Sequence, residues 1–250
     1  MVTISPEGER AGGGGAPDGQ GMFVNGSGQG QQEGGVSDSR EPAGVFRVVV
    51  FADFVCPYSY LAVDQIDRLA REYDVQPLWR PHWLHPDTPA EGSPREHTAE
   101  DASRRERLHA WIREMAPEQY PRIRFPEKRQ YSFRGFEALE FAYDRGLDFP
   151  FKTAVYDLMW TEGGDIGDTD TLLAAAELAG LDPAELNVAL DERLYAQRAL
   201  DAVNTARRIG ITNTPTIFLG KTRINGWHYY EVLQSVIEQQ GLRPRGALAG

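Results

Sequence analysis

Residues 45–52 limit the fold more than any other part of the chain, because they form a nearly continuous run of apolar and β-branched residues. Such a run is typical of a strand that is buried on both faces. A turn over residues 53–57 follows, and the spacing of apolar residues predicts an amphipathic helix over 58–73. Residues 75–80 read as a second strand, in which Pro77 favours an early or edge position. This order predicts a right-handed βαβ unit and an α/β fold class.

The middle of the chain is predicted to be mostly helical, with Gly and Pro residues between the helices. The expected helices cover residues 102–115, 133–145, 150–160 and 170–179. Residues 87–184 carry 20 acidic and 12 basic side chains, so most of the net charge of −11 lies in this stretch. We therefore expect a separate helical layer with an acidic exterior and an aromatic core.

The remainder of the chain returns to mixed structure. The pattern predicts a helix over 191–208, strands at 216–219 and 222–225, and a last helix over 229–239. The first 44 residues hold 13 of the 26 glycines, which predicts a disordered tail that buries too little to order itself.

Composition excludes several classes of protein. No apolar run approaches the ~18 residues of a membrane-spanning helix, so no membrane association is expected. A pI of about 5.0 argues against a nucleic-acid partner. Residues 1–10 hold no apolar stretch of the secretory type, so the expected compartment is the cytoplasm.

Cys56 is the only cysteine, which rules out an intramolecular disulfide and a multi-cysteine zinc site. It stands at the junction of the first strand and the first helix, and Pro57 suits the first helical position. Free amides and the helix dipole favour an anion there, so we expect a lowered pKa and a partly ionised, nucleophilic thiol. Ser59 lies one helical turn further and is placed to donate a hydrogen bond to the sulfur. The alternative is an inert, buried cysteine.

Pro215 precedes the third predicted strand and removes a ladder donor there. It either starts the strand or forms a cis peptide that presents the backbone of Thr214 to a bound chain. Only about 5–6% of X-Pro bonds are cis, so the local sequence alone favours trans.

Four segments, in this order, resemble the DsbA-like branch of the thioredoxin fold, and most closely its FrnE-type oxidoreductases. Residues 54–62 contain Cys-Pro-Tyr-Ser, and residues 84–92 are similar to the family's Leu-x-Pro-Asp-x-Pro-x-Glu-Gly. Residues 162–168 are similar to its Glu-Gly-x-Asp-Ile stretch, and residues 210–216 end in Thr-Pro-Thr. The resemblance implies that Pro215 is cis and lies beside Cys56.

The resemblance also implies a domain organisation. A thioredoxin-like core (βαβ…αββα) is expected from residues 45–86 and 185–241, and a large helical insertion from 87–184. Residues 1–44 are expected to be the disordered tail and 242–250 a flexible C-terminus.

One departure from the family pattern determines the expected mechanism. Most such oxidoreductases have Cys-Pro-x-Cys, whereas Ser59 replaces the resolving cysteine here. An external thiol must therefore release any partner trapped on Cys56, so we expect monothiol chemistry: disulfide exchange, isomerisation or deglutathionylation. The expected substrate is a disulfide-containing protein or small molecule. No bound cofactor is expected, and glutathione remains open as a co-substrate.

The resemblance assigns positioning roles around the sulfur. Pro57 and Tyr58 belong to the turn that stabilises the thiolate of Cys56. Thr214 and Pro215 would hold the substrate by strand-like pairing.

A second branch of the same fold leaves an alternative function. Kappa-class glutathione transferases and 2-hydroxychromene-2-carboxylate isomerases are similar over residues 57–62, with a catalytic serine where Cys56 stands. They carry an acidic glutathione anchor after a glycine, whereas Trp227 and His228 follow Gly226 here. A glutathione-dependent isomerase or transferase is therefore the second hypothesis. A non-catalytic peptide-binding module is the third.

The remaining candidates each have two interpretations. Asp53 either raises the pKa of Cys56, or moves protons, or caps the loop. His228 lies in the cleft or starts a surface helix. His82 and His85 without further ligands make a weak metal case, and no metal is predicted. Two basic clusters are interpreted as solvated faces or as an anionic-ligand site: Arg104, Arg105 and Arg107, and Arg122, Arg124, Lys128 and Arg129.

Overall fold

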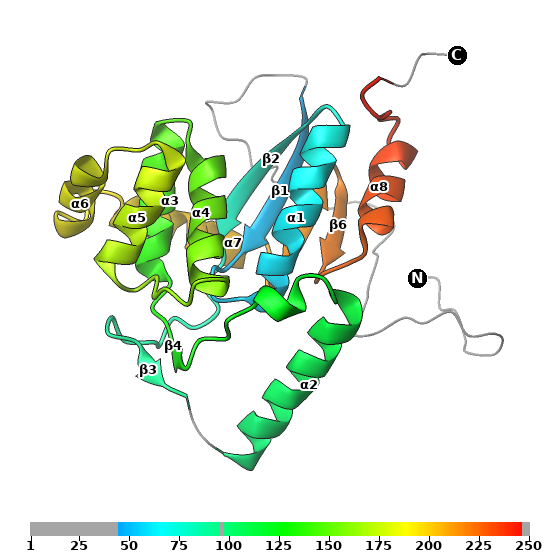
Figure 1. Ribbon diagram of the computed structural model, residues 1–250. Coiled ribbons are helices and arrows are strands. Elements are labelled where there is room, and N and C mark those ends of the chain that lie inside the picture. The colour runs from blue at the N-terminus through cyan, green and yellow to red at the C-terminus, as the bar shows by residue number, and fades with distance from the viewer. Residues whose placement is uncertain (1–44, 96–97, 247–250) are drawn as a thin grey trace.

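A four-stranded mixed sheet forms the centre of the computed structural model, which describes residues 45–95 and 98–246 (Figure 1). The strand order is β2-β1-β5-β6. The strands are β1 (Phe46–Ala52), β2 (Val75–Pro81), β5 (Thr216–Leu219) and β6 (Thr222–Asn225). β1 is parallel to β2 and antiparallel to β5, and β6 is antiparallel to β5. The predicted strands are confirmed, and Pro77 does lie in an edge strand.

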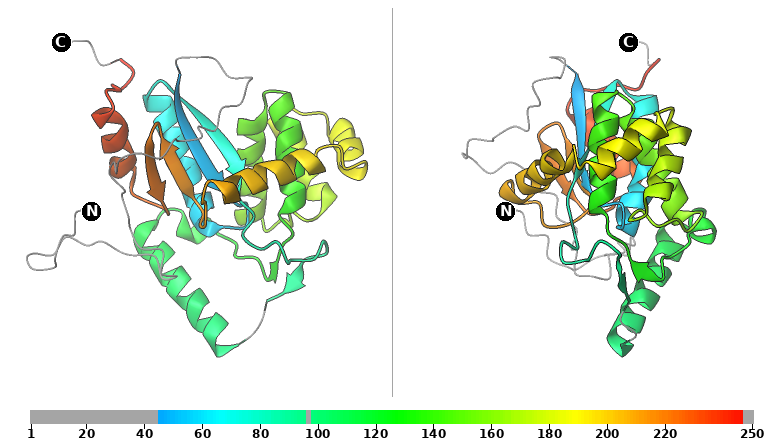
Figure 2. Two further views of the ribbon diagram at one scale, coloured as in Figure 1. Left: turned by 180° about the vertical axis from the view of Figure 1, so that it is seen from behind. Right: turned by 90° about the vertical axis from the view of Figure 1, so that its left-hand side faces the viewer.

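Helices cover both faces of the sheet, which explains why β1 is apolar along its whole length. Val48 and Val50 belong to the large core beneath α1 (Pro57–Glu72) and α8 (Tyr230–Gln239). The alternate residues, Val49 and Phe51, pack with Ala206 of α7 (Ala196–Arg208) on the opposite face (Figure 2). The predicted α/β core is confirmed.

The inserted helices are α2 (Ala99–Met115), α3 (Phe133–Asp144), α4 (Asp148–Trp160), α5 (Thr169–Ala179) and α6 (Pro183–Asp191). The first four confirm the predicted helices to within a few residues at each end. α6 was not predicted, although the Asp182 side chain caps its first turn by accepting from the amides of Ala184 and Glu185. α6 packs on α3 and α5 and crosses the expected boundary between residues 184 and 185.

The helix predicted over 191–208 is wrong over residues 192–195, and Asp191 ends α6 instead of starting α7. Arg193 adopts a left-handed backbone with φ of 56°, so the chain turns between α6 and the start of α7 at Ala196. The sequence pattern does not predict this break, because the apolar residues of α7 are regularly spaced.

Three short elements shape the region next to α2, which extends away from the body of the molecule in Figure 1. β3 (Ser93–Pro94) pairs antiparallel with β4 (Lys128–Arg129), and a 3₁₀ turn, η1 (Tyr120–Arg122), follows α2. Their pairing holds the chain before α2 against the chain after it.

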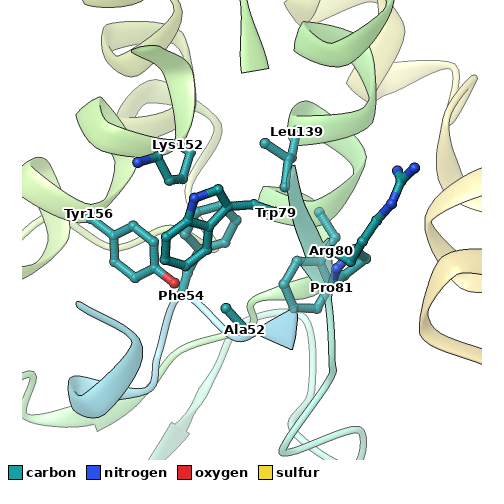
Figure 3. A pocket seen from close by; sticks show the side chains of 9 residues that line it. Ala52, Phe54, Trp79, Arg80, Pro81, Leu139, Lys152 and Tyr156 are labelled. Atoms are coloured by element: carbon teal, nitrogen blue, oxygen red, sulfur yellow. The ribbon is translucent and has the colours of Figure 1, made fainter. Parts of the chain in front are cut away.

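The joint between sheet and insertion is aromatic (Figure 3). Trp79 of β2 meets the ring of Tyr156 from α4 edge-on, with centroids 5.6 Å apart. The ammonium of Lys152 lies 4.9 Å from the Trp79 ring and is fully buried, with its Nζ 3.0 Å from an oxygen of Asp67 on α1. This ion pair ties α4 to the core.

The termini extend beyond the described residues. The predicted tail, 1–44, and residues 247–250 lie outside them. Within 242–246, the Arg245 amide donates to the Glu72 carbonyl at 2.6 Å, and its Nε donates to the Tyr73 carbonyl at 3.0 Å. No helix in the described ranges is long and apolar enough to cross a membrane.

Candidate active site

Cys56 occupies the N-cap of α1, and Pro57 is the first residue of the helix. The Cys56 amide donates to the Asp53 carbonyl at 3.1 Å, which closes the turn after β1. The predicted turn over 53–57 is confirmed. The turn places the sulfur at the N-terminus of α1. The helix can begin at Pro57 because the first helical residue needs no partner for its amide.

Two segments far apart in sequence meet at the sulfur. The Cys56 thiol donates to the carbonyl oxygen of Thr214, with an Sγ–O distance of 3.4 Å. The peptide bond between Thr214 and Pro215 is cis, as the family resemblance implies and against the base rate. The structure thus brings the cysteine turn and the predicted substrate-holding segment together.

The expected low pKa of Cys56 is not found. Burial raises the pKa of this thiol above its usual value of 9.0, and the charge of Asp53 acts in the same direction. Hydrogen bonds with Thr214 and Ser59 lower the pKa, but by less. The residue is only 3% exposed, so loss of water outweighs the favourable helix terminus.

Ser59 and Tyr58 are both buried beside the cysteine. Ser59 stabilises the thiolate through its side chain and its backbone. The hydroxyl of Thr214 has no hydrogen-bond partner among the described residues. The Tyr58 ring packs edge-on against Trp111 of α2, 4.9 Å away, and so joins the cysteine helix to the insertion.

Asp53 is fully buried and links two loops. Its carboxylate accepts from the amide of Val55 at 3.3 Å and from the amide of Leu84 at 2.9 Å. Burial raises its pKa from 3.8 to about 6, although these hydrogen bonds lower it. The carboxylate therefore caps the loop, and its charge also raises the pKa of Cys56, as two of the sequence interpretations expect.

Two aromatic side chains of α4 support the cysteine turn from below. Tyr156 donates from its hydroxyl to the Asp53 carbonyl at 3.3 Å, and Trp160 donates from Nε1 to the Phe54 carbonyl at 2.9 Å. The sequence pattern places Trp160 among the aromatic residues of the insertion, which form its core or partly cover the thiol cleft, and it gives Tyr156 no role at the site. Their spacing carries no signal of this contact, which depends on how α4 docks on the sheet.

A cleft of about 480 Å³ opens above the cysteine. Its lining contains Val55, Cys56 and Pro57, together with Trp160 of α4. Side chains of α2 and of residues 125–130 complete the lining. A cavity of this size suits a small molecule.

Trp227 and His228 are not among the residues that line this cleft. The Trp227 indole packs edge-on against Trp111, 5.4 Å away, and the His228 Nε2 lies 3.1 Å from the Asn225 carbonyl. Neither interpretation of His228 is confirmed, because the residue does not line this cleft and is buried, not on the surface. Burial lowers the pKa of His228, which favours the neutral ring.

Histidines do not form a metal site in the described part of the chain. No group of three or more His, Cys, Asp or Glu residues there could hold a metal ion. His82 is buried at the end of β2, and its amide donates to the Ala52 carbonyl at 2.9 Å.

The sheet order, the cysteine at the start of α1 and the facing cis-proline define a thioredoxin-fold protein with a cysteine-based site. Residues 47–238 match the DSBA-like thioredoxin domain family, so the chain belongs to that family. Thiol–disulfide oxidoreductases and isomerases are typical of this family and its structural neighbours.

Known proteins show the same fold. The chain is 29% identical over 196 residues to the uncharacterized protein YwbO of Bacillus subtilis, covering 77% of this chain and 96% of that one. A probable DsbA oxidoreductase from Streptomyces coelicolor superposes with a TM-score of 0.68 at 20% identity, covering 78% and 89%. A 2-hydroxychromene-2-carboxylate isomerase superposes with a TM-score of 0.59 at 21% identity, covering 78% and 94%.

Proposed function

We propose that this protein is a FrnE-like monothiol oxidoreductase that exchanges disulfides through Cys56 alone. The single observation that carries the proposal is the position of the thiol, which touches the backbone before the cis-proline and opens into a cleft. Ser59 stands where a second thiol would be needed for intramolecular release. An external thiol, such as glutathione, therefore completes the cycle as co-substrate.

The cycle has two balanced steps. The Cys56 thiolate attacks one sulfur of the substrate disulfide, so a Cys56–substrate disulfide forms, the substrate S–S bond breaks, and the leaving thiolate takes up a proton. The thiolate of an external thiol then attacks the substrate sulfur of this mixed disulfide. Cys56 leaves as a thiolate, and a new disulfide joins the substrate and the external thiol.

The raised pKa sets the pH dependence of this activity. Only the thiolate reacts, so the rate rises about tenfold for each pH unit below the thiol pKa. A thiolate of higher pKa is also the stronger nucleophile once formed. We therefore expect slow exchange near neutrality and faster exchange in alkaline solution.

Intact mass spectrometry tests the proposal directly, because Cys56 is the only cysteine. The protein is incubated with oxidised glutathione at several pH values, then with reduced glutathione. The expected result is one glutathione adduct that forms faster at higher pH and is removed by reduced glutathione, with none on Cys56→Ala. An adduct that forms only after unfolding would refute the proposal.

A glutathione-dependent isomerase or transferase is the second candidate. The observation that favours it is the buried, protonated thiol, which can hydrogen-bond a bound sulfur without attacking it. The structural likeness to the isomerase above is compatible with this function. Calorimetry that finds saturable glutathione binding, together with an unmodified mass, would support this candidate over disulfide exchange.

A further inference from the structure

The walls of the Cys56 cleft carry an excess of positive charge in an otherwise acidic protein of net charge −11. Five cationic side chains line the cleft, against two carboxylates, those of Asp101 and Glu127. The cations are Arg95, Arg104, Arg105, Lys128 and Arg129. They come from three separate stretches of the chain, so the cluster is a product of the fold.

Arg95 lies close enough to Arg105 and Arg129 to be repelled by both. After burial, the charges of Arg105 and Arg129 lower the pKa of Arg95, and the charge of Asp101 raises it by less. The charges of Arg129 and Arg95 likewise lower the pKa of His85, after the loss of water in the cleft. Among the described residues, Arg95, Arg105 and Arg129 form no ion pair.

Local structure holds this arrangement in place. Arg95 donates from Nε to the Pro126 carbonyl at 2.9 Å, and Ser93 pairs with Arg129 across the β3–β4 ladder. Lys128 is different, because its ammonium lies 2.5 Å from an Asp165 oxygen. Like charges that the fold holds together without carboxylate partners are stabilised when an anion lies between them.

Part of the lining of the same cleft is apolar. Leu84, Leu108, Phe125 and Trp160 contribute to it, together with Cys56. The Phe125 ring stacks on His109 with centroids 3.9 Å apart and meets Trp160 edge-on at 6.1 Å. The cleft therefore combines apolar and cationic side chains around the thiol.

We propose that the cleft selects small anionic disulfides, whose reacting sulfur meets Cys56, whose apolar portion contacts the apolar lining, and whose carboxylate, sulfonate or phosphate groups meet Arg95, Arg105 and Arg129. This inference rests on the proposed function, because it names the substrate class of the Cys56 reaction. It also predicts that neutral and cationic disulfides of equal size react more slowly.

Charge-matched thiol reagents test the selectivity. The anionic and the cationic methanethiosulfonates, ethylsulfonate and ethyltrimethylammonium, differ only in the charged group, and neutral methyl methanethiosulfonate is the reference. In each case the Cys56 thiolate attacks the divalent sulfur, a disulfide forms, and methanesulfinate leaves. Each rate is divided by the rate of the same reagent with 2-mercaptoethanol, which removes intrinsic reactivity.

The normalised rate is expected to be about tenfold or more higher for the anionic reagent than for the cationic one, because a cationic cleft concentrates anions. The ratio should fall toward one in R105Q/R129Q and in high salt. The control R71Q/R207Q removes the same charge from exposed sites on α1 and α7 and should keep the ratio. A ratio near one in the wild type, or an unchanged ratio in R105Q/R129Q, would overturn the proposal.

A second set of reagents identifies the kind of molecule, peptide or aromatic, that carries the anionic group. Oxidised glutathione and 5,5′-dithiobis(2-nitrobenzoate) are anionic disulfides with a peptide and an aromatic body, and both should react more slowly with R105Q/R129Q. The disulfide with the larger normalised rate shows which of the two molecular types the cleft prefers. If both disulfides react with R105Q/R129Q as fast as with the wild type, the proposal is again overturned. Failure of the proposed function is distinct, because neutral methyl methanethiosulfonate would then also leave Cys56 unmodified.

Discussion

Replacement of Asp53 by asparagine should change how stability depends on pH. The carboxyl is fully buried, and its pKa is raised from 3.8 to about 6. A shift of about two pKa units corresponds to about 3 kcal/mol of free energy between the two protonation states. The buried carboxylate therefore destabilises the folded protein at neutral pH relative to its protonated form.

The direction in which stability changes with pH follows from proton binding. The folded chain holds the Asp53 proton more tightly than the unfolded chain, so this contribution is fully present below pH 3.8 and is lost as pH rises through about 6. The free energy of unfolding of the wild type, minus that of Asp53→Asn, should thus fall by about 2 kcal/mol between about pH 4 and pH 7. Loss of one hydrogen-bond acceptor in the variant adds only a pH-independent offset.

Chemical denaturation of both proteins across this range measures the difference. Asp87→Asn, at an exposed position, is the matched control and should show no such change. Asp53→Asn should also move the inflection in the alkylation rate of Cys56 to lower pH, because the charge of Asp53 raises the pKa of that thiol. A stability difference that stays constant with pH would refute the reasoning.

Three further changes have expected outcomes. Ser59→Cys restores a second thiol one turn from Cys56, so oxidised glutathione should yield an internal disulfide in place of a stable adduct, and a lasting adduct in intact mass would contradict this. Lys152→Ala leaves Asp67 without its buried partner and should cost about 3 kcal/mol in urea unfolding, more than Lys152→Met; equal stability of all three proteins would contradict it. Gly180→Ala forces a side chain into the left-handed end of α5 and should lower stability by about 1 kcal/mol, measurable as a lower Tm.

Much of the fold was predictable because local patterns specify it. The apolar run of β1 and the helical spacing of α1 predicted the central βαβ unit. α6 was missed although Asp182 and Pro183 are a standard start signal, and the start of α7 was misplaced because a single left-handed residue, Arg193, leaves no trace in apolar spacing.

The candidate site, too, was predictable only in part. The sequence alone determined that one cysteine stands at a strand–helix junction, followed by proline and without a second thiol, since these are facts of order along the chain. Only the tertiary structure decided the state of that thiol: packing removes water from Cys56, and this raises its pKa against the effect of the helix terminus.

Tertiary structure also decided what surrounds the sulfur. In the sequence, Arg105 and Arg129 belong to two separate basic clusters and Arg95 to neither. All three line one cleft because β3 pairs with β4 beside α2. His228 follows the last strand closely, yet its ring turns to the Asn225 carbonyl. Burial and charge at a site depend on segments distant along the chain, so they follow from packing and not from local spacing.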